Sequence, residues 1–315
     1  MGGDLGLDAL RADGSWRFGW SDGYLDEAAF RLAPGDPSRR RELVERLLTE
    51  RPDGDPVDVD DPEQWEGVLI AALLTHPASH RLRALDLRLT DYHHSAERAA
   101  TALAGATRPR LERLSFGYGF EYLFEHGEGS AGTRINPMDH YGDGLVRTEI
   151  WEALPALRTL ELEGAFLFPC LDHDGLTRLR TRGAVISDGS AFLPGRLPAL
   201  TSLELELECD VFGVACSVDQ LDELALMADR YPNLRNLDLG RVEFDIGSAE
   251  VLAALADSPL LARLEALTVR DLEISKDQLK RLAPKFAHLT LRVAGIVDVE
   301  GADGEEVRRL LPALA

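Results

Sequence analysis

The stretch "PNLRNLDLG", Pro232–Gly240, decides the fold, because the chain repeats it in altered form. Close variants are "PALRTLELEG" (Pro155–Gly164) and "PALTSLELEL" (Pro198–Leu207). Aligned on its first apolar residue, the six-residue phrase occurs eight times, starting at Leu82, Leu111, Leu157, Leu176, Leu200, Leu234, Leu264 and Phe286. The fourth and sixth positions of each copy are mostly leucine, which is the alternation of a short strand that buries one face.

Segments with a helical pattern lie between several copies. Four of them open with a serine placed to cap the first turn, and they cover residues 95–106, 217–231, 248–258 and 275–286. Two of these serines are followed three residues on by an amide, Gln220 or Gln278, as in a capping box. A strand and a helix recurring about every 30 residues predict stacked repeats, because one such unit cannot bury both of its faces alone.

The phrase L-x-x-L-x-L resembles the leucine-rich repeat family, in its irregular bacterial-type form, from Leu82 to Ile296. The long helical spacers resemble the ribonuclease-inhibitor-like α/β members of that family. The resemblance implies an α/β leucine-rich repeat solenoid, a curved horseshoe with a parallel sheet on the concave face and helices on the convex face. The usual Asn or Cys after the phrase is missing, the spacing is uneven, and Thr181 replaces a core leucine in the fourth copy, so we expect an irregular horseshoe.

Three regions follow from this pattern. Residues 1–80 lack the phrase and are predicted to form a mostly helical N-terminal cap, which covers the apolar end of a solenoid. A separate recognition domain is the alternative for this region. Residues 81–297 hold the repeats, with an insertion at about 117–146, and residues 298–315 are predicted to close the array with a helix.

Charge and composition limit the partners. The chain has 55 acidic and 34 basic residues and a formal net charge of -21, which disfavours nucleic acid and anionic membranes. A partner protein with a basic patch is favoured instead. Cys170, Cys209 and Cys216 form neither a disulfide framework nor a zinc pattern, and no signal peptide or membrane-spanning run is present, so a cytoplasmic protein is expected.

Several short motifs resemble catalytic or cofactor-binding sites, but the residues around them do not fit such sites. "GEGSAG" at 127–132 matches the dinucleotide-binding glycine pattern, but Pro137 opposes the helix that must follow. The adjacent His93 and His94 have no carboxylate partner at ligand spacing, and "DHDG" at 172–175 lacks the rest of a calcium loop. We therefore expect no enzyme, no cofactor and no metal site.

The candidate partner-binding residues are of two kinds. The third, fifth and seventh positions of each phrase point away from the core, and glutamates at these positions of two strands predict a localised negative field. The insertion carries aromatic side chains, which make good binding anchors. Together the candidates are Asp86, Arg88, Arg113, Tyr118, Phe120, Tyr122, Phe124, Tyr141, Glu161, Glu163, Glu204, Glu206, Asp238 and Arg270.

These observations favour a non-enzymatic protein–protein interaction module, a cytoplasmic scaffold, regulator or inhibitor that binds its partner on the concave face and the insertion. One alternative is the immunity or substrate component of a bacterial toxin or protease system. Another alternative is an enzyme with a site in the N-terminal region and the insertion, where His126, Asp139 or His140 could act as acid or base.

Overall fold

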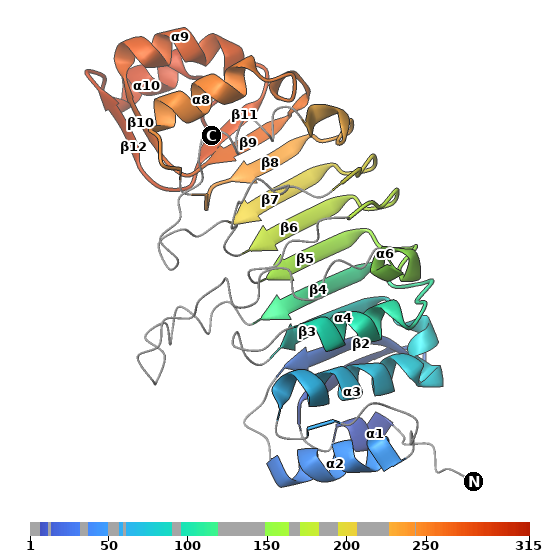
Figure 1. Cartoon of the computed structure of the whole chain (residues 1–315). Helices are drawn as coiled ribbons and strands as arrows, with labels where there is room; N and C mark the ends of the chain where they lie inside the picture. The colour runs from blue at the N-terminus through green and yellow to red at the C-terminus, as the bar shows by residue number, and fades with distance from the viewer. Residues whose placement is uncertain are drawn as a thin grey trace. The chain divides into compact units, whose positions relative to one another are not determined.

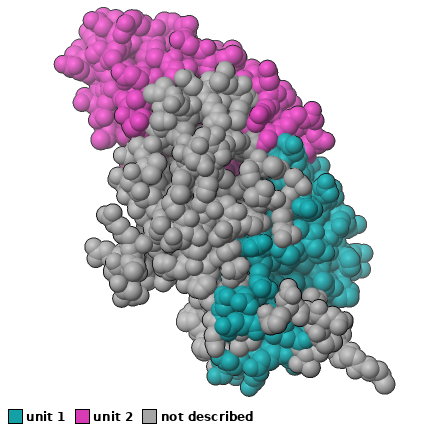
Figure 2. Space-filling model, in the orientation of Figure 1, with its two compact units in different colours: residues 1–173 teal, residues 174–315 magenta. Residues whose placement is uncertain are grey.

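The computed structural model describes residues 7–11, 14–31, 37–49, 57–58, 61–89, 96–118, 149–163, 171–182, 195–206, 227–242 and 244–315. The chain forms two compact units, Met1–His173 and Asp174–Ala315 (Figure 2). Each unit is an α/β structure with a mostly parallel sheet (Figure 1).

Unit 1 has a sheet with the strand order β1-β2-β3-β4-β5. Its strands are β1 (Trp16–Ser21), β2 (Tyr24–Arg31), β3 (Ala84–Leu89), β4 (Arg113–Tyr118) and β5 (Thr159–Glu163). β1 is antiparallel to β2, and the other neighbours are parallel. Its helices are α1 (Leu7–Leu10), α2 (Pro37–Thr49), α3 (Pro62–Thr75), η1 (Pro77–Arg81), α4 (Glu97–Ala104) and α6 (Glu149–Ala153).

Unit 2 has a parallel sheet with the strand order β6-β7-β8-β9-β11 and a second parallel pair, β10 with β12. These strands are β6 (Arg178–Arg182), β7 (Ser202–Glu206), β8 (Asn236–Leu239), β9 (Ala266–Val269), β10 (Leu272–Ser275), β11 (Thr290–Val293) and β12 (Val297–Glu300). The helices are η3 (Met227–Asp229), α8 (Ser248–Asp257), η4 (Leu261–Arg263), α9 (Lys276–Phe286) and α10 (Gly304–Leu310).

The leucines of the phrase form the core of each unit. In unit 1 the fourth-position residues Leu85, Leu114 and Leu160 face each other on neighbouring strands, and all are buried. Leu237 of unit 2 pairs in the same way with Leu203 and Leu267. Because the alternation of a strand has a period of two, this register sends the third, fifth and seventh positions to the opposite face. We call that surface of each unit its open face.

The N-terminal region contains, beside its helices, a hairpin that the sequence analysis did not predict: β1 and β2 are antiparallel, and β2 extends the parallel sheet through β3. The turn is Asp22-Gly23, and both residues have positive φ values, 51° and 79°. An Asp-Gly pair suits such a two-residue turn. Trp16 and Phe30 pack against each other within the hairpin, with ring centroids 5.0 Å apart, and Phe30 also packs against Trp65 of α3, with centroids 6.3 Å apart.

The strand of the last copy of the phrase lies two residues later in the chain than the sequence pattern predicted. Leu291, and not Leu289, pairs with Leu267 across β9 and β11. The reason is that α9 extends through Phe286, and a turn in which the Leu289 amide donates to the Phe286 carbonyl (3.2 Å) delays the strand. The weak fourth copy nevertheless forms β6, with Thr181 half-buried.

The predicted serine caps have mixed outcomes. The capping box at Ser275 is confirmed: its hydroxyl accepts the Gln278 amide (3.3 Å), and the Gln278 side chain accepts the Ser275 amide (2.8 Å). At α8 the cap is wrong, because Gly247 is the N-cap and Ser248 is already helical. Ser95 and Ser217 lie outside the described residues.

Replacement of Leu237 by alanine is expected to lower the free energy of unfolding of unit 2 by about 2–5 kcal/mol, because it removes a buried side chain from the core. Asp238→Ala is the matched neighbour on the open face. Its carboxylate accepts the Gly240 amide (2.8 Å), so a loss of about 1 kcal/mol is expected. Chemical denaturation measures both, and the reverse ranking would mean that the faces are wrongly assigned.

Candidate functional site

The open face of unit 1 carries its side chains in rows that run across β2, β3, β4 and β5. Three rows follow from the strand register: Glu27, Ala84, Arg113 and Thr159; then Ala29, Asp86, Ser115 and Glu161; then Arg31, Arg88, Gly117 and Glu163. The first two rows alternate charged with small residues, and the third places the neighbouring Arg31 and Arg88 beside Gly117 and Glu163.

Two close ion pairs on this face, each under 3 Å, skip a strand. Glu27 and Arg113 meet at 2.5 Å between the Oε1 and Nη2 atoms, with Ala84 on the strand between them. Arg88 and Glu163 lie 2.6 Å apart (Nη1 to Oε2), with Gly117 between them. Two strand spacings amount to about 10 Å, so only long side chains meet across them, and only where the residue between is small.

Gly117 has a conformation that other residues adopt rarely, with φ at 141°. A Cβ atom at this position would lie 1.7 Å from the carbonyl oxygen of Glu163 on β5. No side chain fits there. Glycine is therefore required both for the backbone and for the passage of the Arg88 side chain toward Glu163.

Arg88 is the centre of the charge network. Its guanidinium reaches Asp86 (Nε to Oδ1, 2.8 Å) and Glu163 (2.6 Å), with Glu161 farther away (Nη2 to Oε2, 3.9 Å). Asp86 also contacts Arg31 (3.0 Å). The negative charge predicted for Glu161 and Glu163 is thus compensated by the guanidinium of Arg88. The sequence predicted an exposed Glu163, but this residue is buried.

The depth of these groups differs in a consistent way. The side chains of Asp86 and Glu163 are 26% and 10% exposed, and Arg88 is 15% exposed. By contrast, the side chains of Arg31 and Arg113 are both 60% exposed. Most carboxylates of this face therefore lie at its base, whereas the outermost groups are mainly guanidinium groups.

A groove of about 570 Å³ runs over these rows. Its floor includes the small residues Gly19, Ala29 and Ala84, and Arg17 and Arg31 are among its charged walls. Arg17 is exposed and lies on β1, opposite Ala29. The hairpin of the N-terminal region thus contributes to the face that the sequence assigned to the repeats alone.

The open face of unit 2 has a similar arrangement. Glu204 contacts Arg178 (3.4 Å) and Arg180 (3.1 Å), and its side chain is 26% exposed, whereas that of Arg178 is 53% exposed. Arg270 is 46% exposed and lies 3.6 Å from Asp271 (Nε to Oδ2). In the contacts of Arg178 and Arg270 the more exposed member is the arginine, whereas Arg180 and Glu204 are equally exposed.

One further ion pair lies at the starts of β3 and β4. Arg83 donates to Glu112 (2.8 Å), and this hydrogen bond holds the pKa of Glu112 below its ordinary value. A lowered folded-state pKa means that the contribution of the pair is present above the unfolded pKa and is lost as the pH falls through the lowered value. Both side chains are substantially exposed, so the contribution to stability is small.

Several predicted site residues cannot be placed. Phe120, Tyr122, Phe124 and Tyr141 lie outside the described residues, as do His126, Asp139 and His140. The backbones of Tyr118 and Glu206 are described and belong to β4 and β7, but their side chains are not. The other predicted residues Asp86, Arg88, Arg113, Glu161 and Glu163 meet on one face of unit 1, and Glu204, Asp238 and Arg270 belong to unit 2.

Sequence reasoning missed Arg17, Glu27 and Arg31, which complete the network from the hairpin. The Asp22-Gly23 turn between two alternating segments was the signal that could have found them. Within the described ranges, no group of three or more His, Cys, Asp or Glu residues could hold a metal ion. No helix in that part of the chain is long and apolar enough to cross a membrane.

Comparison with known proteins concerns the fold. No protein-family model and no curated protein matches the chain. A crystal structure of a Bacteroides fragilis protein, a structural-genomics target, is similar with a TM-score of 0.54 and 15% sequence identity, and the match covers 94% of this chain and 85% of that chain. At this identity the likeness shows a shared fold alone.

Proposed function

We propose that the chain is a non-enzymatic protein-interaction module of the leucine-rich repeat type, which acts in the bacterial cytoplasm as a scaffold, regulator or inhibitor. The repeat assignment is supported by the buried leucines that keep one register from strand to strand, such as Leu203, Leu237 and Leu267. Stacked repeats commonly use the open side of their sheet to bind a partner. The open face of unit 1, with its groove, is the proposed binding surface.

The observation that carries this proposal is the order of exposure on that face. A partner approaching the groove meets Arg17, Arg31 and Arg113, together with the one outer carboxylate of Glu27, before it meets Asp86 or Glu163. We therefore propose an acidic segment of a partner protein as the occupant. This replaces the basic patch that the composition favoured for this face.

The net charge of the whole chain does not oppose such binding. The formal charge of -21 is spread over 315 residues. At physiological ionic strength, exposed charges beyond about 8 Å are largely screened, so the nearest groups dominate at contact. Arginine is also suited to carboxylates, because its planar fork can donate two parallel hydrogen bonds.

The groove suits an extended segment. Its small floor residues Gly19, Ala29 and Ala84 leave room for a backbone, and its arginines flank that floor. The aromatic residues of the insertion remain a predicted second part of the binding surface.

The test is the triple variant Arg17→Gln, Arg31→Gln and Arg113→Gln. The probe is a fluorescein-labelled 12-residue peptide of alternating Glu and Ser, compared with its Lys/Ser counterpart by fluorescence anisotropy. We expect the acidic peptide to bind the native protein, with at least tenfold weaker binding to the variant and a smaller dependence on salt. The variant should still fold, since exposed ion pairs contribute about 0–1 kcal/mol each.

Arg196→Gln is the matched control. Arg196 is exposed and paired with Asp174 in unit 2, and it lies outside the groove, so its loss should leave binding unchanged. Tighter binding of the basic peptide, or equal weakening by the control, would count against the proposal.

A further inference from the structure

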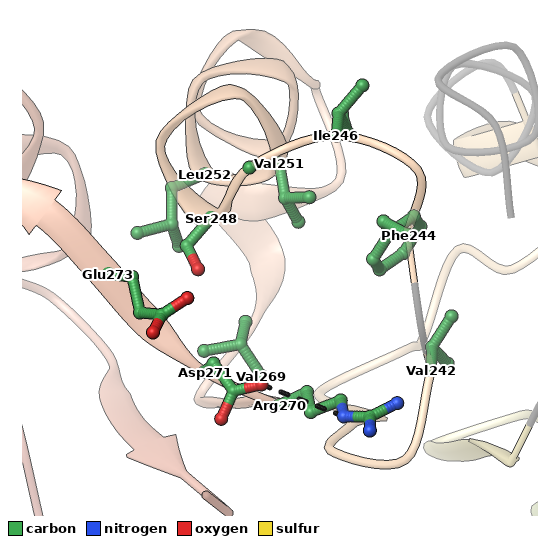
Figure 3. Close-up of a pocket in the computed structure, with 11 residues that line it drawn as sticks. Val242, Phe244, Ile246, Ser248, Val251, Leu252, Val269, Arg270, Asp271 and Glu273 are labelled. Atoms are coloured by element: carbon green, nitrogen blue, oxygen red, sulfur yellow. Dashed lines mark ion pairs between the residues drawn. The ribbon is translucent and has the colours of Figure 1, made fainter. Parts of the chain in front are cut away.

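A pocket of about 210 Å³ lies in unit 2, where β9 ends and α8 begins (Figure 3). Polar atoms supply the larger part of its lining surface, and six of its lining residues are apolar: Val242, Phe244, Ile246, Val251, Leu252 and Val269. Phe244 and Ile246 are only half-buried, so they present apolar surface to an incoming group. The pocket is lined by none of the residues that line the groove of unit 1.

The polar lining of this pocket contains two carboxylates, together with one guanidinium, that of Arg270. Asp271 and Glu273 line it, and Figure 3 shows both carboxylates on the side of the pocket away from Phe244 and Ile246. Asp271 is already engaged, because it accepts the Ile296 amide (2.7 Å) and lies 3.6 Å from Arg270. Glu273 is exposed and has no ion pair within the part of the chain that the structure describes.

The strand register adds a second carboxylate beside Glu273. β10 and β12 are parallel, and Glu273 pairs with Asp298, which is also exposed and has no ion pair among the described residues. Like charges on directly paired positions destabilise a sheet. A cationic group placed beside the two carboxylates would remove that repulsion.

Exposed apolar side chains flank these acids. Ile296 and Val297 are 58% and 46% exposed, and they are the exposed large apolar residues of unit 2 within the described ranges. Backbone hydrogen bonds tie them to the pocket, because the Leu272 amide donates to the Ile296 carbonyl (2.8 Å). Apolar surface thus lies close to the carboxylates both inside the pocket and beside it.

An anion is the wrong occupant, although α8 begins at this pocket. Glu250 in the first turn of α8 already lies over that end, since a Cβ atom on Gly247 would be 2.8 Å from its Oε2 atom. This carboxylate occupies the place where an anion would benefit from the helix dipole. Charge and shape together therefore favour a group with an apolar stem and a cationic head.

We infer that this pocket is a second binding site, which takes a lysine or arginine side chain carried by an apolar segment of a partner protein. The apolar stem lies against Phe244, Val251 and Val269, and the cationic head lies beside Glu273 and Asp298. An apolar neighbour of the cationic residue covers the exposed Ile296. This pocket is therefore the proposed binding site for the basic partner that the composition favours.

The test uses the peptide acetyl-Ile-Lys-Val-Lys-Ile-amide as the probe, together with versions in which norleucine or glutamate replaces lysine. Calorimetry measures the affinity of each peptide. The NMR shifts of the Val251 and Val269 methyl groups show whether the peptide binds in the pocket. We expect the lysine peptide to bind at least tenfold more tightly than the other two. The double variant Glu273→Gln and Asp298→Asn should bind the lysine peptide at least tenfold more weakly than the native protein does.

Glu265→Gln is the matched control, because Glu265 is an exposed carboxylate of the same unit that lies outside the pocket, 3.8 Å from Arg235. Equal binding of the norleucine peptide, an equal effect of the control, or absence of the methyl shifts would overturn the inference. So would self-association of the native chain that Ile296→Ser and Val297→Ser abolish, because a second copy would then be the occupant. The Arg17, Arg31 and Arg113 triple variant should bind the peptide normally, so this test is independent of the proposed function.

Discussion

Gly117→Ala is expected to lower the free energy of unfolding of unit 1 by about 4 kcal/mol or more, the range of exceptional single substitutions. The added Cβ atom would lie 1.7 Å from the Glu163 carbonyl oxygen, which belongs to the backbone of β5 and cannot turn away. β4 and β5 must therefore separate, and the pair between Arg88 and Glu163 is lost with them. Chemical denaturation followed by circular dichroism measures the effect.

Gly23→Ala separates the two contributions to this cost. Gly23 also has a positive φ, 79°, but a Cβ atom there would meet nothing within 4 Å. Its loss should cost only the strain of a left-handed conformation, about 1–2 kcal/mol. Equal effects at the two positions would show that the contact with Glu163 is not what requires glycine at 117.

Arg88→Met should produce the second large effect, a loss of about 3 kcal/mol, because it leaves a buried carboxylate without its partner. Glu163 has a side chain only 10% exposed, and its ion-pair partner Arg88 lies 2.6 Å away. Arg88→Lys should restore only part of the loss, since an ammonium group cannot reach Asp86 and Glu163 together as the guanidinium does.

A double-mutant cycle identifies the interaction. Adding Glu163→Gln to Arg88→Met should recover part of the stability, because the unpaired charge is then absent. Arg178→Met is the matched control: its side chain is 53% exposed in its contact with Glu204, so a change within about 1 kcal/mol is expected. Equal losses for Arg88→Met and Arg178→Met would mean that the network around Arg88 is solvated like an ordinary surface.

The sequence alone was sufficient to predict most strands of the repeated phrase and their buried positions, but not the hairpin of β1 and β2 or the register of β11. Leucines two residues apart, as at Leu85 and Leu87, mark a half-buried strand without any tertiary information, and both are buried. The capping box at Ser275 was equally readable, because its partners lie three residues apart in the chain. The Asp22-Gly23 pair is also a turn signal from which the hairpin could have been predicted.

The charge arrangement of the open face depended on tertiary structure. Arg88 and Glu163 are far apart in sequence, and their meeting requires the register that places Gly117 between them. A sequence pattern predicts which side chains face away from the core, but it does not predict how much of each side chain is exposed to solvent. The glutamates of the repeats therefore predicted an acidic face, whereas the structure buries Glu163 and leaves Arg31 and Arg113 outermost.

The local pattern was thus enough for the α/β character, for most strands of the repeated phrase and for their core leucines, because each follows from interactions a few residues apart in the chain. Tertiary structure alone decided which strands adjoin, which charges pair, and that the hairpin of β1 and β2 completes the face. The physical reason is that these contacts depend on the register between strands separated by many residues, and that register is set only when the cores of the neighbouring strands pack together.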